Sequence, residues 1–187
     1  MSKPSVSCII LAGGEGKRVN RADKGLIELR GQPLVAHVIN AIQHQVDDIV
    51  ISANRNLELY RQFSSNVIPD TSGQHGPLSG IAAALPVCRH EQVLVVPCDM
   101  PYLPENLLVT LQTHIEQHDI TIADVQHHLQ LVFLMRKLLL PSVQEHISTG
   151  KHKLMQWVKS CSHTTVDFSA NADAFKNINS INELNQI

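Results

Sequence analysis

The chain has 187 residues, of which 43% are hydrophobic and 17% are charged, and its formal net charge is −2. This length suits one domain with a proper core, and this composition is typical of a globular protein rather than a disordered one. The lack of a basic excess argues against a general nucleic-acid binder, although it leaves room for a local cationic pocket. No stretch approaches the roughly 18 apolar residues of a membrane span. The cysteines lack CxxC spacing, so we expect a cytoplasmic protein with reduced thiols.

Strand and helix patterns alternate along the chain. The apolar run 6–11 ends at glycines and predicts a buried strand. In 33–46, apolar residues recur on one helical face after Pro33, which is a favoured residue at a helix start. The further strands are expected at 48–54, 66–70, 92–100, 120–125, 129–135 and 164–168. The further helices are expected at 56–63, 80–88, 104–118, 137–147, 151–160 and, after a Ser180 cap, near 179–187.

Continuous apolar strands that alternate with helices predict an α/β fold of three layers, Rossmann-like, with a mostly parallel central sheet. Ligands of such sheets bind at the carboxyl ends of the strands. In this sequence those ends carry Gly13 and Gly14, then 52–54, Asp70 and Asp99. We therefore expect these positions to meet in one site.

The segment 8–34 has the features of a phosphate-binding turn. Its glycines are not spaced as in a P-loop, and "GEGKRV" has valine where a dinucleotide-binding loop has its third glycine. A strand, a tight glycine turn and two separated cations, Arg18 and Lys24, remain. Both cations can reach a triphosphate if the loop folds over it, which suits a transferase that stabilises a leaving pyrophosphate. The alternative is an ordinary turn with solvated basic residues.

Two acidic residues follow buried strands. Asp99, in a loop stiffened by neighbouring prolines, is a good ligand for Mg²⁺, which prefers oxygen donors and often bridges carboxylates to substrate phosphates. A helix or turn cap is the alternative for Asp99. Asp70 could accept hydrogen bonds from the adjacent donors of guanine, bind a ribose, or act as a turn acceptor, and the sequence does not choose among these.

The segments "LAGG", "GKR", "DKGLIELRGQPL", "NRNLELY", "IPD", "GPLSGI" and "PCDMPYLP" occur in this order between residues 11 and 104. Together with "FKNINSINEL" near the end, they resemble the molybdenum cofactor guanylyltransferases, also called the molybdopterin-guanine dinucleotide synthase family. LAGG by itself is shared by many nucleotidyltransferases of this fold. The related cytidylyltransferases usually have LAAG, so Gly14 favours guanine.

The resemblance implies a nucleotidyltransferase fold in one domain, 1–187, with a nucleotide-binding half over about 1–110 and a pterin-binding half over about 111–187. It implies transfer of GMP from GTP to Mo-molybdopterin with Mg²⁺ as cofactor, and other molybdenum cofactor proteins as partners. The implied catalytic residues are Arg18, Lys24 and Asp99, with Asp99 as the metal ligand. The implied nucleotide-binding residues are Leu11, Ala12, Gly13, Lys24, Ser52, Asp70 and Asp99. The implied pterin-binding residues are Gly76, Gly80, Asn177 and Asn179.

The sequence also departs from the family. In the family, asparagine is common at the position of Ser52, and a His-Pro pair precedes a later strand. This chain has "HHLQLVFLM" in place of that pair. Two rivals therefore stay open: a cytidylyl- or sugar-nucleotidyltransferase of the same fold, and a non-catalytic nucleotide-binding relative. Phosphate cations and a metal carboxylate argue against the second, because decay of a catalytic site usually removes them first.

Overall fold

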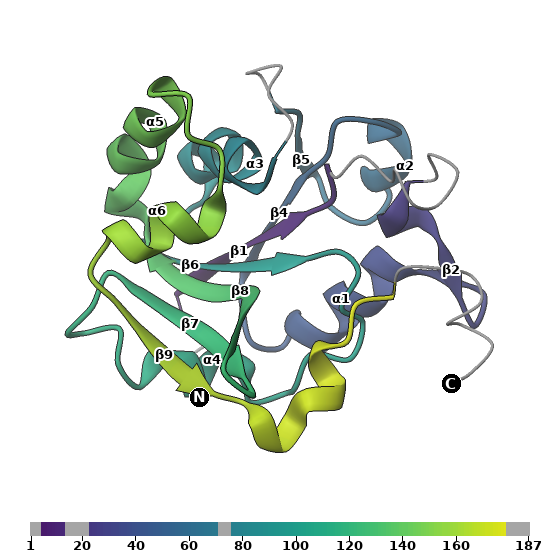
Figure 1. Cartoon of the computed structure of the whole chain (residues 1–187). Helices are drawn as coiled ribbons and strands as arrows, with labels where there is room; N and C mark the ends of the chain where they lie inside the picture. Colours follow the sequence, from purple (N-terminus) through teal and green to yellow (C-terminus); the bar gives the residue numbers. More distant parts are fainter. Residues whose placement is uncertain (1–4, 14–22, 71–75, 179–187) are drawn as a thin grey trace.

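A computed structural model describes residues 5–13, 23–70 and 76–178. Its main feature is a seven-stranded sheet with the order β5-β4-β1-β6-β8-β7-β9 (Figure 1). The strands are β1 (Val6–Leu11), β4 (Asp48–Ser52), β5 (Asn66–Ile68), β6 (Gln92–Pro97), β7 (Ile120–Val125), β8 (His128–Arg136) and β9 (His163–Asp167). Within this described sheet β8 runs antiparallel to both of its neighbours, and the other pairings are parallel. The predicted α/β class and mostly parallel sheet are confirmed.

Helices cover both faces of the sheet, as Figure 1 shows. The α-helices are α1 (Leu34–Ile42), α2 (Leu57–Tyr60), α3 (Pro77–Ala84), α4 (Leu107–Gln112), α5 (Leu140–Ser148) and α6 (Leu154–Ser160). The 3₁₀ helices are η1 (Lys24–Leu26), η2 (Leu85–Val87), η3 (Lys137–Leu139) and η4 (Ser169–Phe175). Side chains of α1, α4 and η4 pack in one apolar cluster, and those of α3, α5 and α6 pack in another.

The central strands are apolar on both sides because each side faces one of these clusters. In β1, Cys8 and Ile10 belong to the cluster of α1 and α4, whereas Ile9 belongs to the cluster of α3 and α6. Successive side chains of a strand point to opposite faces, so a strand between two helical layers reads as a continuous apolar run.

Several predicted boundaries are wrong by a few residues. The helix expected at 104–118 is α-helical only over Leu107–Gln112, because bonds from Ile115 to Gln112 and from Gln117 to His114 tighten the chain into 3₁₀-type turns. The helix expected from residue 80 begins at Pro77 instead, where proline fits the first helical position. The helix expected near 179–187 lies outside the described residues.

The sequence analysis missed a small hairpin, β2 (Glu28–Leu29) and β3 (Gln32–Pro33). Arg30 and Gly31 form its turn with φ of 52° and 78°, the left-handed pair typical of a type I′ hairpin turn. The hairpin carries buried Leu29 into a small cluster with Ile27, Leu34 and Ile178. It therefore ties the segment before α1 to the C-terminal segment.

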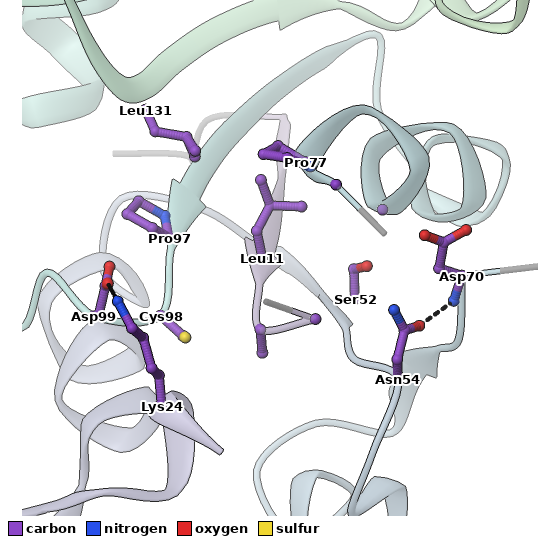
Figure 2. A pocket seen from close by; sticks show the side chains of 14 residues that line it. Leu11, Lys24, Ser52, Asn54, Asp70, Pro77, Pro97, Cys98, Asp99 and Leu131 are labelled. Atoms are coloured by element: carbon purple, nitrogen blue, oxygen red, sulfur yellow. Dashed lines mark hydrogen bonds and ion pairs between the residues drawn. The ribbon is translucent and has the colours of Figure 1, made fainter. Parts of the chain in front are cut away.

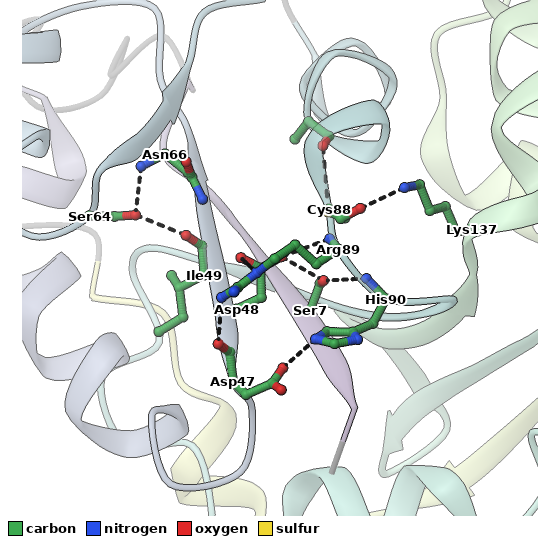
Figure 3. Close-up of polar contacts among 11 residues, drawn as sticks. Ser7, Asp47, Asp48, Ile49, Ser64, Asn66, Cys88, Arg89, His90 and Lys137 are labelled. Atoms are coloured by element: carbon green, nitrogen blue, oxygen red, sulfur yellow. Dashed lines mark hydrogen bonds and ion pairs between the residues drawn. The ribbon is translucent and has the colours of Figure 1, made fainter. Parts of the chain in front are cut away.

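A polar cluster joins the amino ends of β1, β4 and β6 (Figure 3). Ser7 Oγ donates to Asp48 Oδ2 at 2.7 Å and accepts the backbone N–H of His90 at 3.1 Å. The backbone N–H of Arg89 donates to Asp48 Oδ2 at 2.9 Å, and its Nε lies 3.2 Å from Oδ1. Burial alone would raise the pKa of Asp48, but the bonds from Ser7 and Arg89 outweigh burial and lower that pKa. Polar side chains at this edge of the sheet therefore stabilise the fold.

Candidate active site

A cavity of about 390 Å³ opens at the carboxyl ends of β1, β4, β5 and β6. This is the edge at which parallel α/β sheets bind ligands. The residues that line it are Leu11, Ala12, Gly13, Lys24, Ser52, Asn54, Asp70, Gly76, Pro77, Gly80, Pro97, Cys98, Asp99 and Leu131. They come from segments far apart in the sequence, which the parallel sheet brings to one rim.

Most of the expected site residues line this cavity. Every expected nucleotide-binding position is among the lining residues, and so are Gly76 and Gly80. Asn177 is exposed and is not part of the lining. Arg18 and Asn179, together with Gly14, lie outside the described residues.

Lys24 and Asp99 form an ion pair at one end of the cavity (Figure 2), with Nζ 3.2 Å from Oδ2. Asp99 follows β6 and its side chain is only 10% exposed, whereas Lys24 begins η1 and its side chain is 27% exposed. Within the described lining Lys24 is the only cation. The pair therefore places one fixed positive and one fixed negative charge beside the glycine turn after β1.

Asp70 and Asn54 form the other end of the cavity (Figure 2). The backbone N–H of Asp70 donates to Asn54 Oδ1 at 2.7 Å. Because a backbone N–H can only donate, this bond fixes which amide atom of Asn54 is the oxygen. A Cβ added to Gly13 would lie 3.1 Å from Asn54 Nδ2, so the amide packs directly on the glycine turn. The amide of Asn54 therefore joins the turn after β1 to the chain after β5.

Gly80 makes the close approach of α3 to the strand ends possible. A Cβ at this position would lie 2.6 Å from Ser52 Oγ, which is closer than real Cβ contacts allow, and 3.1 Å from Leu11 Cδ2, which is tighter than most of them. The glycine thus has a packing role in the cavity wall, whatever ligand the wall contacts.

Apolar side chains form the remaining wall. Figure 2 shows Leu11, Pro77, Pro97 and Leu131 around the upper part of the cavity. Burial raises the pKa of the Cys98 thiol well above its usual range, and the neighbouring Asp99 carboxylate adds to the effect. Cys98 therefore lines the cavity as a neutral thiol.

Several of these lining residues were missed by the sequence analysis. Asn54 was expected there, as part of the strand end 52–54, and it does line the cavity. Pro97 could have been found, because it lies at the end of β6, just before Asp99. Leu131 could not, because it lies inside β8 and reaches the rim only through the pairing of β8 with β6.

The C-terminal segment touches the site through its backbone. The N–H of Ile178 donates to the carbonyl of Asp99 at 2.9 Å, and the Ile178 side chain is buried against the hairpin. The neighbouring Asn177 is thereby held close to the loop of Asp99, although it does not line the cavity.

The donor chemistry of the site fits a hard cation. Among the described residues no group of three or more histidine, cysteine, aspartate or glutamate side chains could form a metal cage. Asp99 offers a nearly buried carboxylate at the end of the cavity that holds Lys24, and Mg²⁺ commonly binds through one or two carboxylates plus waters and substrate phosphates. In the described part of the chain, no helix is both long and apolar enough to cross a membrane.

Comparison with known proteins places these features in a family. The sequence model of the MobA-like NTP transferase domain matches residues 8–166. A molybdenum cofactor guanylyltransferase from Shewanella frigidimarina is 37% identical over 98% of this chain and 96% of its own length. The protein of the same name from Pasteurella multocida is 37% identical over 95% of this chain and 96% of its own length.

Solved structures share the fold. Molybdopterin-guanine dinucleotide biosynthesis protein A from Archaeoglobus fulgidus superposes with a TM-score of 0.77, at 20% identity, over 96% of this chain and 95% of its own. The bifunctional IspDF of Campylobacter jejuni gives a TM-score of 0.76 at 15% identity, over 98% of this chain and 54% of its own. At such identities the likeness shows the fold alone. The identity to the curated relatives over nearly full length, together with the match to the domain model, shows that this chain belongs to the molybdenum cofactor guanylyltransferase family of MobA-like nucleotidyltransferases.

Proposed function

We propose that the chain transfers GMP from GTP to Mo-molybdopterin and releases pyrophosphate. The observation that carries this proposal is the single cavity in which a glycine turn, the Lys24–Asp99 pair and Asp70 lie together. Full-length relatives that bear the name of this activity support the same reaction.

In this proposal the triphosphate of GTP lies along the glycine turn toward Lys24, and the base lies toward Asp70. Backbone N–H groups of the turn approach the phosphates, and glycine at position 13 lets the turn pack tightly on Asn54. In this proposal the carboxylate of Asp70 accepts two hydrogen bonds from guanine, and Asn54 supports Asp70 by accepting its backbone N–H. Arg18 is assigned to the phosphates on the resemblance alone.

The reaction forms one bond and breaks one. A terminal phosphate oxygen of molybdopterin attacks the α-phosphorus of GTP, and the bond from that phosphorus to the oxygen bridging to the β-phosphate breaks. The electron pair of the broken bond leaves with pyrophosphate. The attacking oxygen is already anionic, so no strong general base is needed, and Lys24 lowers the barrier by neutralising charge on the leaving group.

Mg²⁺ is the cofactor that the family implies, and Asp99 is the residue that would hold it. Bound there, the ion would supply charge neutralisation for the phosphates. Asp99 and Lys24 act together in this arrangement, because the carboxylate keeps the ammonium group at the phosphate end of the cavity.

The acceptor side of the site is proposed from two glycines of the lining and from two asparagines that the resemblance alone assigns. Gly76 and Gly80 form the wall between the two ligands, and Asn177 with Asn179 would face the pterin. The division into a nucleotide-binding half, about 1–110, and a pterin-binding half, about 111–187, follows the same assignment. Leu131 of the second half lines the cavity of the first, so the two halves contribute to one site.

The decisive experiment supplies purified chain with Mo-molybdopterin, Mg²⁺ and one labelled nucleoside triphosphate at a time, and measures pyrophosphate release and labelled dinucleotide. We expect turnover with GTP and little with CTP, UTP or ATP. Preference for CTP or UTP would favour the cytidylyl- or sugar-nucleotidyltransferase alternative. Nucleotide binding without pyrophosphate release would favour a non-catalytic relative.

The role of Asp70 is tested in the same assay. Asp70→Asn should lose the preference for GTP over ATP, because an amide cannot accept both guanine hydrogen bonds. Asp173→Asn is the matched control, since the Asp173 side chain is 91% exposed and is not part of the cavity lining. An unchanged preference in Asp70→Asn would assign Asp70 to the ribose or to the turn.

A further inference from the structure

The chain segment Asp23–Gly25 is docked on helix α2 by contacts outside the cavity lining. Tyr60 Oη donates to Asp23 Oδ1, and Asn56 Nδ2 donates to Asp23 Oδ2 at 3.1 Å. The carbonyl of Asp23 accepts the N–H of Leu26 at 3.0 Å, which closes η1. Each carboxylate oxygen of Asp23 is therefore held by a different residue, one within α2 and one just before it.

Gly25 shows how closely this segment approaches Tyr60. A Cβ on Gly25 would lie 2.4 Å from Tyr60 Oη, so no larger residue fits without movement of the buried ring. Lys24 lies between the two docked residues, and its Nζ reaches Asp99 Oδ2 from there. The backbone of Lys24 is thus fixed on both sides.

Tyr60 is well suited to hold this segment. Its side chain is fully buried, and burial, with Cys98 and Asp23 nearby, raises the pKa of its hydroxyl, so it remains a neutral donor to Asp23. The chain just before α2 carries Asn54, which binds the N–H of Asp70. The segment 54–60 therefore contacts Asp70 at one end of the cavity and Asp23, the residue before Lys24, near the other.

We infer that Asp23, held by Tyr60 and Asn56, is a positioning residue that aims Lys24 at the phosphate end of the cavity. This inference rests on the proposed function of Lys24. A lysine side chain has several rotatable bonds, so its ammonium group can point in many directions. Fixing the backbone of Lys24 therefore reduces the volume that Nζ can occupy. Asp23 does not line the cavity, so it acts through Lys24 and not on the substrate.

A double-mutant cycle tests this inference in the pyrophosphate-release assay. Tyr60→Phe removes only the hydroxyl, and we expect kcat to fall about tenfold, the value of one good hydrogen bond. In a Lys24→Ala background the same change should leave kcat unchanged, because the group that Asp23 positions is gone. Tyr60→Phe should lower the free energy of unfolding by the same amount in both backgrounds.

Ser64→Ala is the matched control. The Ser64 hydroxyl donates to the carbonyl of Ile49 at 2.8 Å and accepts the N–H of Asn66 at 3.1 Å, just beyond the same helix, and neither bond involves Lys24. It should lower stability while kcat stays the same. If Tyr60→Phe does not fold, Asn56→Ala at the exposed start of the helix replaces it in the cycle.

The outcomes separate the inference from the function on which it rests. An unchanged kcat in Tyr60→Phe, or an equal loss in both backgrounds, would overturn the positioning role while the role of Lys24 stands. Wild-type kcat in Lys24→Ala alone would overturn both. A loss confined to the background that contains Lys24 supports the inference.

Discussion

Replacement of Gly80 by alanine tests how α3 packs on the cavity. The added Cβ would lie 2.6 Å from Ser52 Oγ, and Ser52 is only 2% exposed, so the hydroxyl cannot move away into solvent. Overpacking of this kind costs about 3 kcal/mol at the upper end of its usual range. Alanine regains about 1 kcal/mol over glycine in a helix. The net loss is about 2 kcal/mol.

The structure also specifies how this loss is reversed. Ser52→Ala removes the clashing oxygen and leaves the Ser52 Cβ at 3.4 Å, an ordinary contact. The double variant Ser52→Ala/Gly80→Ala should therefore regain the lost stability, and Ser52→Ala alone should stay close to wild type. The Leu11 methyl group at 3.1 Å is the far end of a flexible side chain and can turn aside.

Thermal and urea unfolding of the four proteins measure these differences. A loss of about 2 kcal/mol lowers Tm by roughly 4–8 °C in a domain of this size. Wild-type stability in Gly80→Ala would show that α3 does not approach the strand ends as closely as described. A double variant no more stable than Gly80→Ala would show that Ser52 is not the obstacle.

Three further predictions concern other parts of the molecule. Asp99→Ala should lower kcat by about 10²–10³ or more while the far-UV circular dichroism stays native; a near-normal rate would remove the assigned metal role. The folded pKa of Asp48 is lowered, so its stabilisation is present above the unfolded pKa of about 3.9 and is lost as pH falls through the folded value. Urea unfolding between about pH 6 and 3 should show this loss, with a shallower dependence in Ser7→Ala, which deletes one bond to Asp48; an identical slope would contradict the assignment. Ile178→Ala should cost about 2–5 kcal/mol through the cavity left beside the hairpin, read from calorimetric Tm, and an unaltered Tm would show that this segment is not packed there.

Local patterns in the sequence were enough to predict much of the fold. The apolar run of β1 and the one-sided helix at 33–46 gave the correct element types. A strand buried on both faces is apolar at every position, whereas a helix buried on one face has apolar residues three or four positions apart. Helix ends were harder to place. Whether the chain after Gln112 continues as α-helix or tightens into 3₁₀ turns depends on where it must meet β7, and that is set by tertiary packing.

The candidate site shows the same division. Gly13, Asp70 and Asp99 could be found from the sequence, since each follows a strand and parallel strands end at one rim. Leu131 could not, because strand pairing alone brings it there. The docking of Asp23 on Tyr60 was also invisible, since nothing local pairs residues 37 positions apart.

The sequence by itself therefore determined the class of fold, the edge of the sheet at which the cavity opens and the chemical groups that gather there. These follow from residue type and from spacing over a few positions, where the chain geometry is fixed. Only the tertiary structure decided that Lys24 pairs with Asp99, that Gly80 must be small and that α2 holds Asp23. Those contacts join distant segments, and their distances depend on how strands, helices and loops pack together.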